Sequence, residues 1–191
     1  MEISVKNLCK SYGDTVVLDN FSLDASSEKP VCLMAPSGRG KTTLFNILLG
    51  LLPADSGEIN GTADKRFSAV FQEDRLCEEL SALMNLAIVS DNPDKQHLTQ
   101  LLLSMGLEED EIRRPVTELS GGQRRRVAIL RAIVSRSDIV MMDEPFKGLD
   151  DATRTQVITR IKENLGDRML LVITHDEADA QLLGADIVYI E

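Results

Sequence analysis

One short stretch of the chain carries the residue types that bind phosphate. It consists of Ala35, Pro36, Ser37, Gly38, Arg39, Gly40, Lys41, Thr42 and Thr43. Four apolar residues precede it, and apolar residues at 44, 45, 48 and 52 follow at roughly helical spacing, which predicts a buried strand, a loop and a helix. At a helix N-terminus the unpaired backbone N–H groups and the helix dipole favour an anion, and glycine lets that anion approach the backbone closely. The stretch therefore predicts a phosphate-binding loop.

Gly40, Lys41 and Thr42 complete most of the P-loop pattern. In that pattern the lysine reaches the β- and γ-phosphates of a nucleotide, and the threonine hydroxyl can ligate a magnesium ion. One position departs from the pattern, because Ala35 stands where it begins with glycine. Alanine fits there if its backbone stays in the β region.

Polar residues also follow three other predicted strands. They are Gln72 after a run at 67–71, Asp143 and Glu144 after a run at 139–142, and His175 after a run at 169–173. Binding sites of α/β sheets collect at such strand ends. Of the two adjacent carboxylates, one can face a metal and the other the reacting phosphate, although such a pair can also be only a helix cap. For His175, a structural role and a role in the site both stay open.

A second exposed helix start is predicted at Ser120. This serine is suited to an N-cap, Gly121, Gly122 and Gln123 follow it, and apolar residues at 127, 130, 133 and 134 continue at helical spacing. Such a start again suits phosphate. The three arginines at 124–126 raise the alternative of nucleic-acid binding, but in an acidic chain we expect them to be salt-bridged or packing residues.

The composition limits what kind of protein presents these residues. With 191 residues, 43% of them hydrophobic, the chain can bury one substantial core, so we expect a single domain over 1–191. Its net charge of −10 argues against binding to nucleic acid or to anionic lipid, since both would repel it. The start of the chain shows no secretory signal, and no apolar stretch approaches the length of a membrane-spanning helix. Three widely spaced cysteines fit thiols that a cytosol keeps reduced.

The order of the predicted elements gives an α/β fold. Residues 2–9 and 16–23 alternate apolar and polar positions around a turn at Tyr12, which predicts an antiparallel pair. The Tyr12 ring is either a half-exposed side chain or a surface for an adenine to stack on. We expect an antiparallel β subdomain over about 1–30 and 55–70, a helical insert over about 76–136, and a P-loop core with a mostly parallel sheet in the remainder.

These motifs, in this order, resemble those of the ATP-binding cassette (ABC) family of transporter ATPases. Tyr12 resembles the adenine-stacking aromatic, 35–43 the Walker A loop, Gln72 the Q-loop, 119–123 the LSGGQ signature, 139–144 the Walker B strand, Asp150 the D-loop and His175 the switch histidine. The resemblance covers essentially the whole chain. It is strongest to importer subunits, including the nitrate, sulfonate and taurine type.

The resemblance implies that two such domains enclose ATP between them. Ser120 and Gly122 of one chain then contact the γ-phosphate that Lys41 of the other holds. The implied nucleotide-binding residues are Tyr12, Pro36, Ser37, Gly38, Arg39, Gly40, Lys41, Thr42, Thr43, Ser120, Gly121, Gly122, Gln123 and Asp150. Arg39 is expected on the surface of the loop rather than in a catalytic role.

The same resemblance implies roles in hydrolysis. Thr42, Gln72 and Asp143 would hold Mg²⁺, Glu144 would polarise the attacking water, and His175 would keep the γ-phosphate and water in line. Catalytic roles are therefore implied for Glu144, His175, Gln72 and Lys41. These parts match phosphoryl transfer, which depends on positioning and charge stabilisation.

The implied partners are a second ATPase subunit, giving a homodimer, and an integral membrane subunit that holds the chain at the cytoplasmic face of the membrane. The implied cofactors are ATP and Mg²⁺. The alternatives are a non-transport ABC ATPase, such as a cell-division or cofactor-assembly switch, and a nucleotide-binding module with little turnover. The last is motivated by Ala35 and by Lys147, which stands where the D-loop has a small residue. The chain ends soon after His175, so we expect no regulatory tail.

Overall fold

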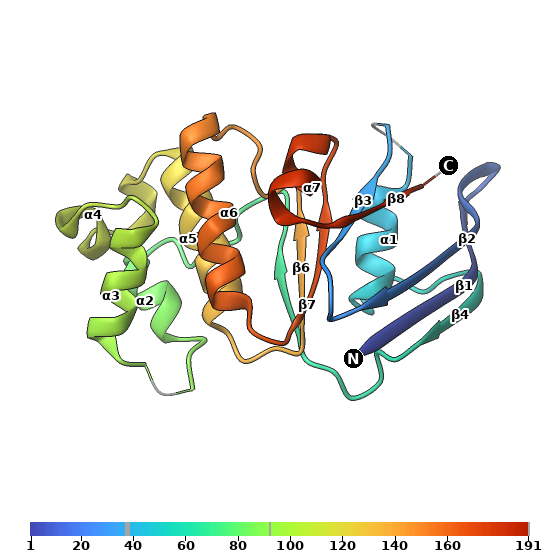
Figure 1. Ribbon diagram of the computed structural model, residues 1–191, viewed down its shortest axis with the longest axis horizontal. Helices are drawn as coiled ribbons and strands as arrows, with labels where there is room; N and C mark the ends of the chain where they lie inside the picture. The colour runs from blue at the N-terminus through green and yellow to red at the C-terminus, as the bar shows by residue number, and fades with distance from the viewer. Residues whose placement is uncertain (37–38, 92, 191) are drawn as a thin grey trace.

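The computed structural model describes residues 1–36, 39–91 and 93–190 (Figure 1). Ser37 and Gly38 of the expected phosphate loop lie outside these residues. The strands are β1 (Glu2–Tyr12), β2 (Thr15–Ser26), β3 (Val31–Met34), β4 (Ser56–Asn60), β5 (Phe67–Val70), β6 (Ile139–Asp143), β7 (Met169–Ile173) and β8 (Asp186–Tyr189). The helices are α1 (Lys41–Leu48), α2 (Ala82–Ala87), α3 (Lys95–Ser104), α4 (Glu109–Arg113), the 3₁₀ helix η1 (Val116–Glu118), α5 (Gly121–Val134), α6 (Asp151–Leu165) and α7 (Glu177–Leu183).

A five-stranded sheet in the order β5-β6-β7-β3-β8 forms the centre of the fold, and its paired strands are all parallel. Every residue of β3, β6 and β7 is buried. This burial explains their continuous apolar sequences: a strand that is covered on both faces has no solvent-exposed side, so apolar and polar residues do not alternate along it. The sheet confirms the α/β class predicted from the sequence.

A second sheet, in the order β2-β1-β4, is antiparallel. Its first two strands confirm the pair predicted around the turn after Tyr12. The prediction that this antiparallel subdomain extends to about residue 70 is wrong for residues 67–70. These residues form β5, which pairs in parallel with β6, from Phe67 opposite Ile139 to Val70 opposite Met142. Arg66, just before β5, also donates its backbone N–H to the Asp138 carboxylate just before β6, which holds β5 in the parallel sheet.

The two faces of the parallel sheet are buried in two separate cores. On β6, Ile139 and Met141 pack into a core with α1 and the antiparallel sheet, whereas Val140 and Met142 pack into a core with the remaining helices. Side chains that alternate along a strand point to opposite faces, which divides them in this way. In Figure 1, α1 lies beside the antiparallel sheet and α2 to α6 lie at the opposite end of the molecule.

The helices between β5 and β6 form the predicted insert. Ser81, Asp94 and Ser120 cap α2, α3 and α5 with their side-chain oxygens, which accept backbone N–H groups of the first turn. Within the described ranges 1–36, 39–91 and 93–190, no helix combines the length and the apolar character needed to cross a membrane.

Candidate phosphate-binding site

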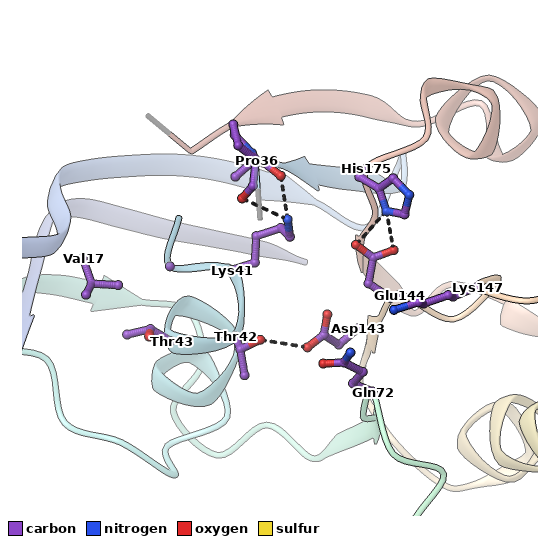
Figure 2. A pocket seen from close by; sticks show the side chains of 12 residues that line it. Val17, Pro36, Lys41, Thr42, Thr43, Gln72, Asp143, Glu144, Lys147 and His175 are labelled. Carbon is purple, nitrogen blue, oxygen red and sulfur yellow. Dashed lines mark hydrogen bonds and ion pairs between the residues drawn. The ribbon is translucent and has the colours of Figure 1, made fainter. Parts of the chain in front are cut away.

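A pocket of about 570 Å³ opens at the carboxyl edge of the parallel sheet (Figure 2). Its lining residues are Val17, Ala35, Pro36, Gly40, Lys41, Thr42, Thr43, Gln72, Asp143, Glu144, Lys147 and His175. Segments that follow β3, β5, β6 and β7 supply most of these residues, because the carboxyl ends of parallel strands meet at one edge. Residues as far apart in the sequence as Val17 and His175 therefore line one cavity.

The Lys41 side chain binds back to the backbone of the predicted phosphate loop. Its Nζ donates hydrogen bonds to the carbonyl oxygens of Ala35, at 2.6 Å, and Pro36, at 3.2 Å. Ala35 is not among the residues with positive φ, so alanine at the start of the loop causes no backbone strain. The ammonium group is thus held inside the pocket, at the start of α1.

Among the described residues of the loop, Gly40 is a position that requires glycine. Its φ is +78°, and a Cβ there would lie 2.7 Å from the carbonyl oxygen of Val17. Gly40 is also the N-cap of α1 and provides no side-chain cap. The first backbone N–H groups of α1 are therefore available to an anion at the positive end of the helix dipole.

Thr42 and Asp143 present two oxygens that fit a shared magnesium ion. The Thr42 hydroxyl donates to Asp143 Oδ2 at 3.3 Å, and Gln72 lines the same side of the pocket (Figure 2). An octahedral Mg²⁺ with bonds of about 2.1 Å places neighbouring ligand oxygens roughly 3 Å apart, and it prefers a few protein oxygens completed by water and phosphate. Burial raises the pKa of Asp143, and the Thr42 hydrogen bond opposes this rise.

Glu144 and His175 form the polar pair at the far side of the pocket. His175 Nδ1 lies 2.8 Å from Glu144 Oε2 and 3.0 Å from Oε1 (Figure 2). The Glu144 side chain is 14% exposed and that of His175 is 66% exposed. Glu144 also has φ of +47°, a left-handed conformation that non-glycine residues rarely adopt. The backbone thus turns sharply after β6 and directs the second carboxylate into the pocket.

The predicted signature residues lie outside this pocket. Ser120 caps α5, accepting the Gln123 N–H at its Oγ, while the Gln123 side chain accepts the Ser120 N–H. Ser120 and Gly121 are exposed, and Gly122 is partly so. None of these residues lines the pocket that holds Lys41, so the site of one chain does not include its own signature helix start.

Three further predicted residues also lie outside the pocket lining. Tyr12 is 51% exposed and Lys10 Nζ lies 5.7 Å from its ring centroid. Arg39 is exposed, as expected for a surface residue of the loop. Asp150 caps α6, and the Thr153 backbone N–H, followed by the Thr153 hydroxyl, lowers the pKa of its carboxyl group.

The sequence did not assign two residues that line the pocket. Val17 lies in β2 and lines the pocket beside the predicted phosphate loop. No local sequence pattern predicts this position. Lys147 lines the pocket from the turn after β6, and in Figure 2 its ammonium end points into the pocket. In the sequence, Lys147 was noted only because it stands where the D-loop of the family has a small residue.

Taken together, the pocket offers a cation and helix N-terminus for phosphate, oxygens for magnesium, and an oriented carboxylate. The ABC transporter family matches residues 18–147 of the chain. The chain is 34% identical over 197 residues to the spermidine/putrescine import ATP-binding protein PotA of Thermotoga maritima, covering 94% of this chain and 53% of that protein. It therefore spans about half the length of this relative.

Two other similarities extend over nearly the whole chain. It is 32% identical to the aliphatic sulfonates import ATP-binding protein SsuB 3 of Rhodococcus jostii, covering 100% of this chain and 72% of that protein. Its fold matches a dimeric ATP-binding cassette solved in a post-hydrolysis state with ADP and Pi, with a TM-score of 0.84, 28% identity, and coverage of 99% of this chain and 94% of that one. The chain belongs to the ABC transporter family, as the resemblance of its motifs predicted.

Proposed function

We propose that the chain is the ATP-hydrolysing subunit of an ABC importer and works as a dimer on a membrane partner. The observation that supports this most is the convergence of the Lys41 ammonium, the Thr42–Asp143 oxygens and the Glu144–His175 pair in one pocket. Relatives named as import ATP-binding proteins support the importer role.

Each part of the pocket has a task in phosphoryl transfer. Lys41 and the N-terminus of α1 bind the β- and γ-phosphates, which replaces the interaction of the ammonium with its own loop carbonyls. Thr42, Asp143 and Gln72 would hold Mg²⁺, which supplies positive charge to the phosphate oxygens when it is bound. Glu144 orients the attacking water and accepts its proton, and His175 holds the carboxylate in place.

The position of Ser120 supports a site made by two chains. The exposed N-terminus of α5 lies outside the pocket of its own chain but has the helix start and glycines that bind phosphate. In a dimer, Ser120, Gly121 and Gly122 of one chain close on the phosphates held by the other. The dimeric state of the similar cassette with ADP and Pi supports this arrangement.

A groove of about 520 Å³ next to Gln72 suits the membrane partner. It is lined by Glu73, Asp74, Arg75, Leu76, Glu78, Val116, Thr117 and Arg124. Glu73 and Glu78 are exposed, and among the described residues neither forms a salt bridge. Cytoplasmic loops of membrane proteins carry an excess of Lys and Arg, so a short basic helix from such a loop is the complementary occupant. This charge complementarity supports a position of the working chain at the cytoplasmic face of a membrane.

ATP hydrolysis by the purified chain tests the enzymatic part. We expect release of phosphate that depends on Mg²⁺ and falls at least about 100-fold in Glu144→Gln, because the amide cannot accept a proton from water. ATP binding should persist in this variant. Absence of hydrolysis in the unmodified chain, or equal hydrolysis in Glu144→Gln, would show that the chain is only a nucleotide-binding module or that another group is the base.

A site-specific crosslink tests the membrane partner. A photoreactive residue at Thr117, in the groove, should crosslink in cells to an integral membrane protein, whereas the same residue at Thr159, on the exposed face of α6, should not. Both positions are exposed threonines, which makes them a matched pair. The importer role is wrong if Thr117 yields only soluble partners or the same products as Thr159.

A further inference from the structure

Arg125 binds the backbone of the loop that carries Gln72. It lies in the second turn of α5 and is only 7% exposed. Its Nη1 donates to the Phe71 carbonyl oxygen at 2.6 Å, and its Nη2 donates to the Gln72 carbonyl oxygen at 2.6 Å. Nη1 also lies 3.3 Å from Asp74 Oδ1. One guanidinium group therefore contacts three residues of a four-residue segment.

These contacts suit arginine and no other side chain. Its planar guanidinium carries several donors in a fixed fork, so it can hold two neighbouring carbonyl oxygens and a carboxylate at once. A buried charge is costly unless it is paired and hydrogen-bonded, and here it is both. The contacts therefore fix the backbone of Phe71 and Gln72 relative to α5.

A second arginine, Arg131, extends the connection further along the same helix. Arg131 Nη2 donates to the Arg75 carbonyl oxygen at 2.9 Å and to the Asp74 carbonyl oxygen at 3.3 Å. The segment from Phe71 to Arg75 is thus bonded to α5 along its length. The Gln72 side chain itself is exposed and lines the phosphate-binding pocket (Figure 2).

We propose that Arg125 is a positioning residue for the reaction: it holds Gln72 in the pocket and makes the Gln72 loop move together with α5. Ser120 lies at the N-terminus of α5. When a second chain closes on Ser120, a movement of α5 would therefore also move Gln72 of the chain to which that Ser120 belongs. This inference rests on the proposed function, since it takes Gln72 to act on the magnesium site and Ser120 to contact the partner's nucleotide.

Two other roles of Arg125 predict different results. Arg125 could serve only to stabilise the fold, or its charge could act on Asp143, whose pKa it lowers against the effect of burial. Neither role passes through the Gln72 side chain. A double-mutant cycle between Arg125 and Gln72 separates them, because the loss of a group that acts through Gln72 cannot matter once the Gln72 amide is absent.

The experiment measures kcat and KM for ATP in the full chain with Mg²⁺. The variants are Arg125→Met, which keeps the aliphatic stem and removes the guanidinium, Gln72→Ala, and the combination. We expect Arg125→Met to lower kcat about 10- to 100-fold, the usual range for residues that orient a metal site, with KM within about threefold. In the Gln72→Ala background, Arg125→Met should change kcat by less than about twofold.

Arg136→Met is the control, since Arg136 follows the end of α5 and its salt bridge, to Asp91, is at the surface. It should keep the unmodified rate. If Arg125→Met does not fold, Arg125→Lys takes its place, because one ammonium keeps the charge near Asp74 but cannot donate to both carbonyls as a fork. The same non-additivity with Gln72→Ala is expected.

The outcomes distinguish this inference from the proposed function. An unchanged kcat in Arg125→Met, or a loss of more than about tenfold that persists in the Gln72→Ala background, overturns the positioning role while Gln72 keeps its own. If Gln72→Ala alone keeps the full rate, the proposed magnesium-site role of Gln72 fails and the inference fails with it.

Discussion

His175 contacts both carboxylate oxygens of Glu144, at 2.8 and 3.0 Å from its Nδ1. The two residues follow neighbouring strands, since Asp143 of β6 lies opposite Ile173 of β7 and the Glu144 N–H donates to the Ile173 carbonyl at 2.8 Å. The register of two parallel strands thus sets the distance between a carboxylate and an imidazole. In the proposed reaction this pair fixes the direction in which Glu144 faces the attacking water.

Replacing His175 should therefore slow hydrolysis without preventing nucleotide binding. We expect His175→Ala to lower kcat about 100-fold, because loss of the imidazole lets the Glu144 carboxylate rotate out of line. The affinity for ATP should change by less than about threefold, since Lys41 and α1 are unaffected. Equal kcat in the variant and the unmodified chain would show that the pair does not orient the base.

The close packing behind Gly40 predicts a specific loss in Gly40→Ala. Gly50 is the matched control: its φ of +71° resembles the +78° of Gly40, but no atom lies within 4 Å of where its Cβ would be. Gly50→Ala should cost about 1 kcal/mol of stability, the cost of alanine in a left-handed conformation. Gly40→Ala should cost more and also weaken ATP binding at least about tenfold, because the loop must move away from Val17. Thermal unfolding and nucleotide titration measure both effects, and equal results for the two variants would refute this explanation.

The ion pair between Lys10 and Asp55 predicts a dependence of stability on pH. Lys10 Nζ lies 2.7 Å from Asp55 Oδ1, and this hydrogen bond, followed by that from the Ser11 N–H, lowers the pKa of the carboxyl group. A carboxyl whose pKa is lower in the folded state stabilises the protein above its unfolded pKa, and this contribution is lost as pH falls through the folded value.

The free energy of unfolding should therefore be lower in Asp55→Asn than in the unmodified chain at pH 7. This difference should shrink as the pH falls below about 4, where the carboxyl also becomes neutral. Urea unfolding at several pH values measures it. A difference that stays constant from pH 7 to pH 3 would mean that the charge of Asp55 is not its cause.

The exposed position of Ser120 predicts that a bulky charge there affects a second chain. Ser120→Arg should leave ATP binding to the single chain unchanged, since Ser120 does not line its pocket, but should abolish turnover. Mixing the Ser120→Arg chain with the Lys41→Ala chain tests whether Ser120 acts on the site of its own chain or on that of its partner. A mixed pair has at most one intact site, so full activity of such mixtures would refute action between chains.

The sequence predicted the parts of the site whose signal is local. The apolar run before Asp143 marks a buried strand, and the polar residues that end it lie at the carboxyl edge, where the structure places them. The phosphate loop was recognisable from Lys41 and its glycine neighbour for the same reason. The arginines after the signature were correctly expected to pack and pair, since Arg124 and Arg125 lie at 3.9 and 3.3 Å from Asp74.

The errors and omissions involve long-range pairing. The strand Phe67–Val70 was assigned to the antiparallel sheet because four residues cannot show which strand they pair with. Val17 lines the pocket because β2 packs closely against Gly40. The contact of Arg125 with Gln72 joins residues that lie 53 positions apart. No local pattern encodes such approaches.

The size of the Glu144→Gln chain in solution, with saturating ATP and Mg²⁺, tests the two-chain site most directly. Sedimentation should show a particle of twice the chain mass of 21.1 kDa, because bound ATP that is not hydrolysed joins the Lys41 loop of one chain to the Ser120 helix start of the other. With ADP, or with Ser120→Arg added, the mass of a single chain should return. A particle of 21.1 kDa under the ATP condition would contradict the central claim that two chains share the nucleotide.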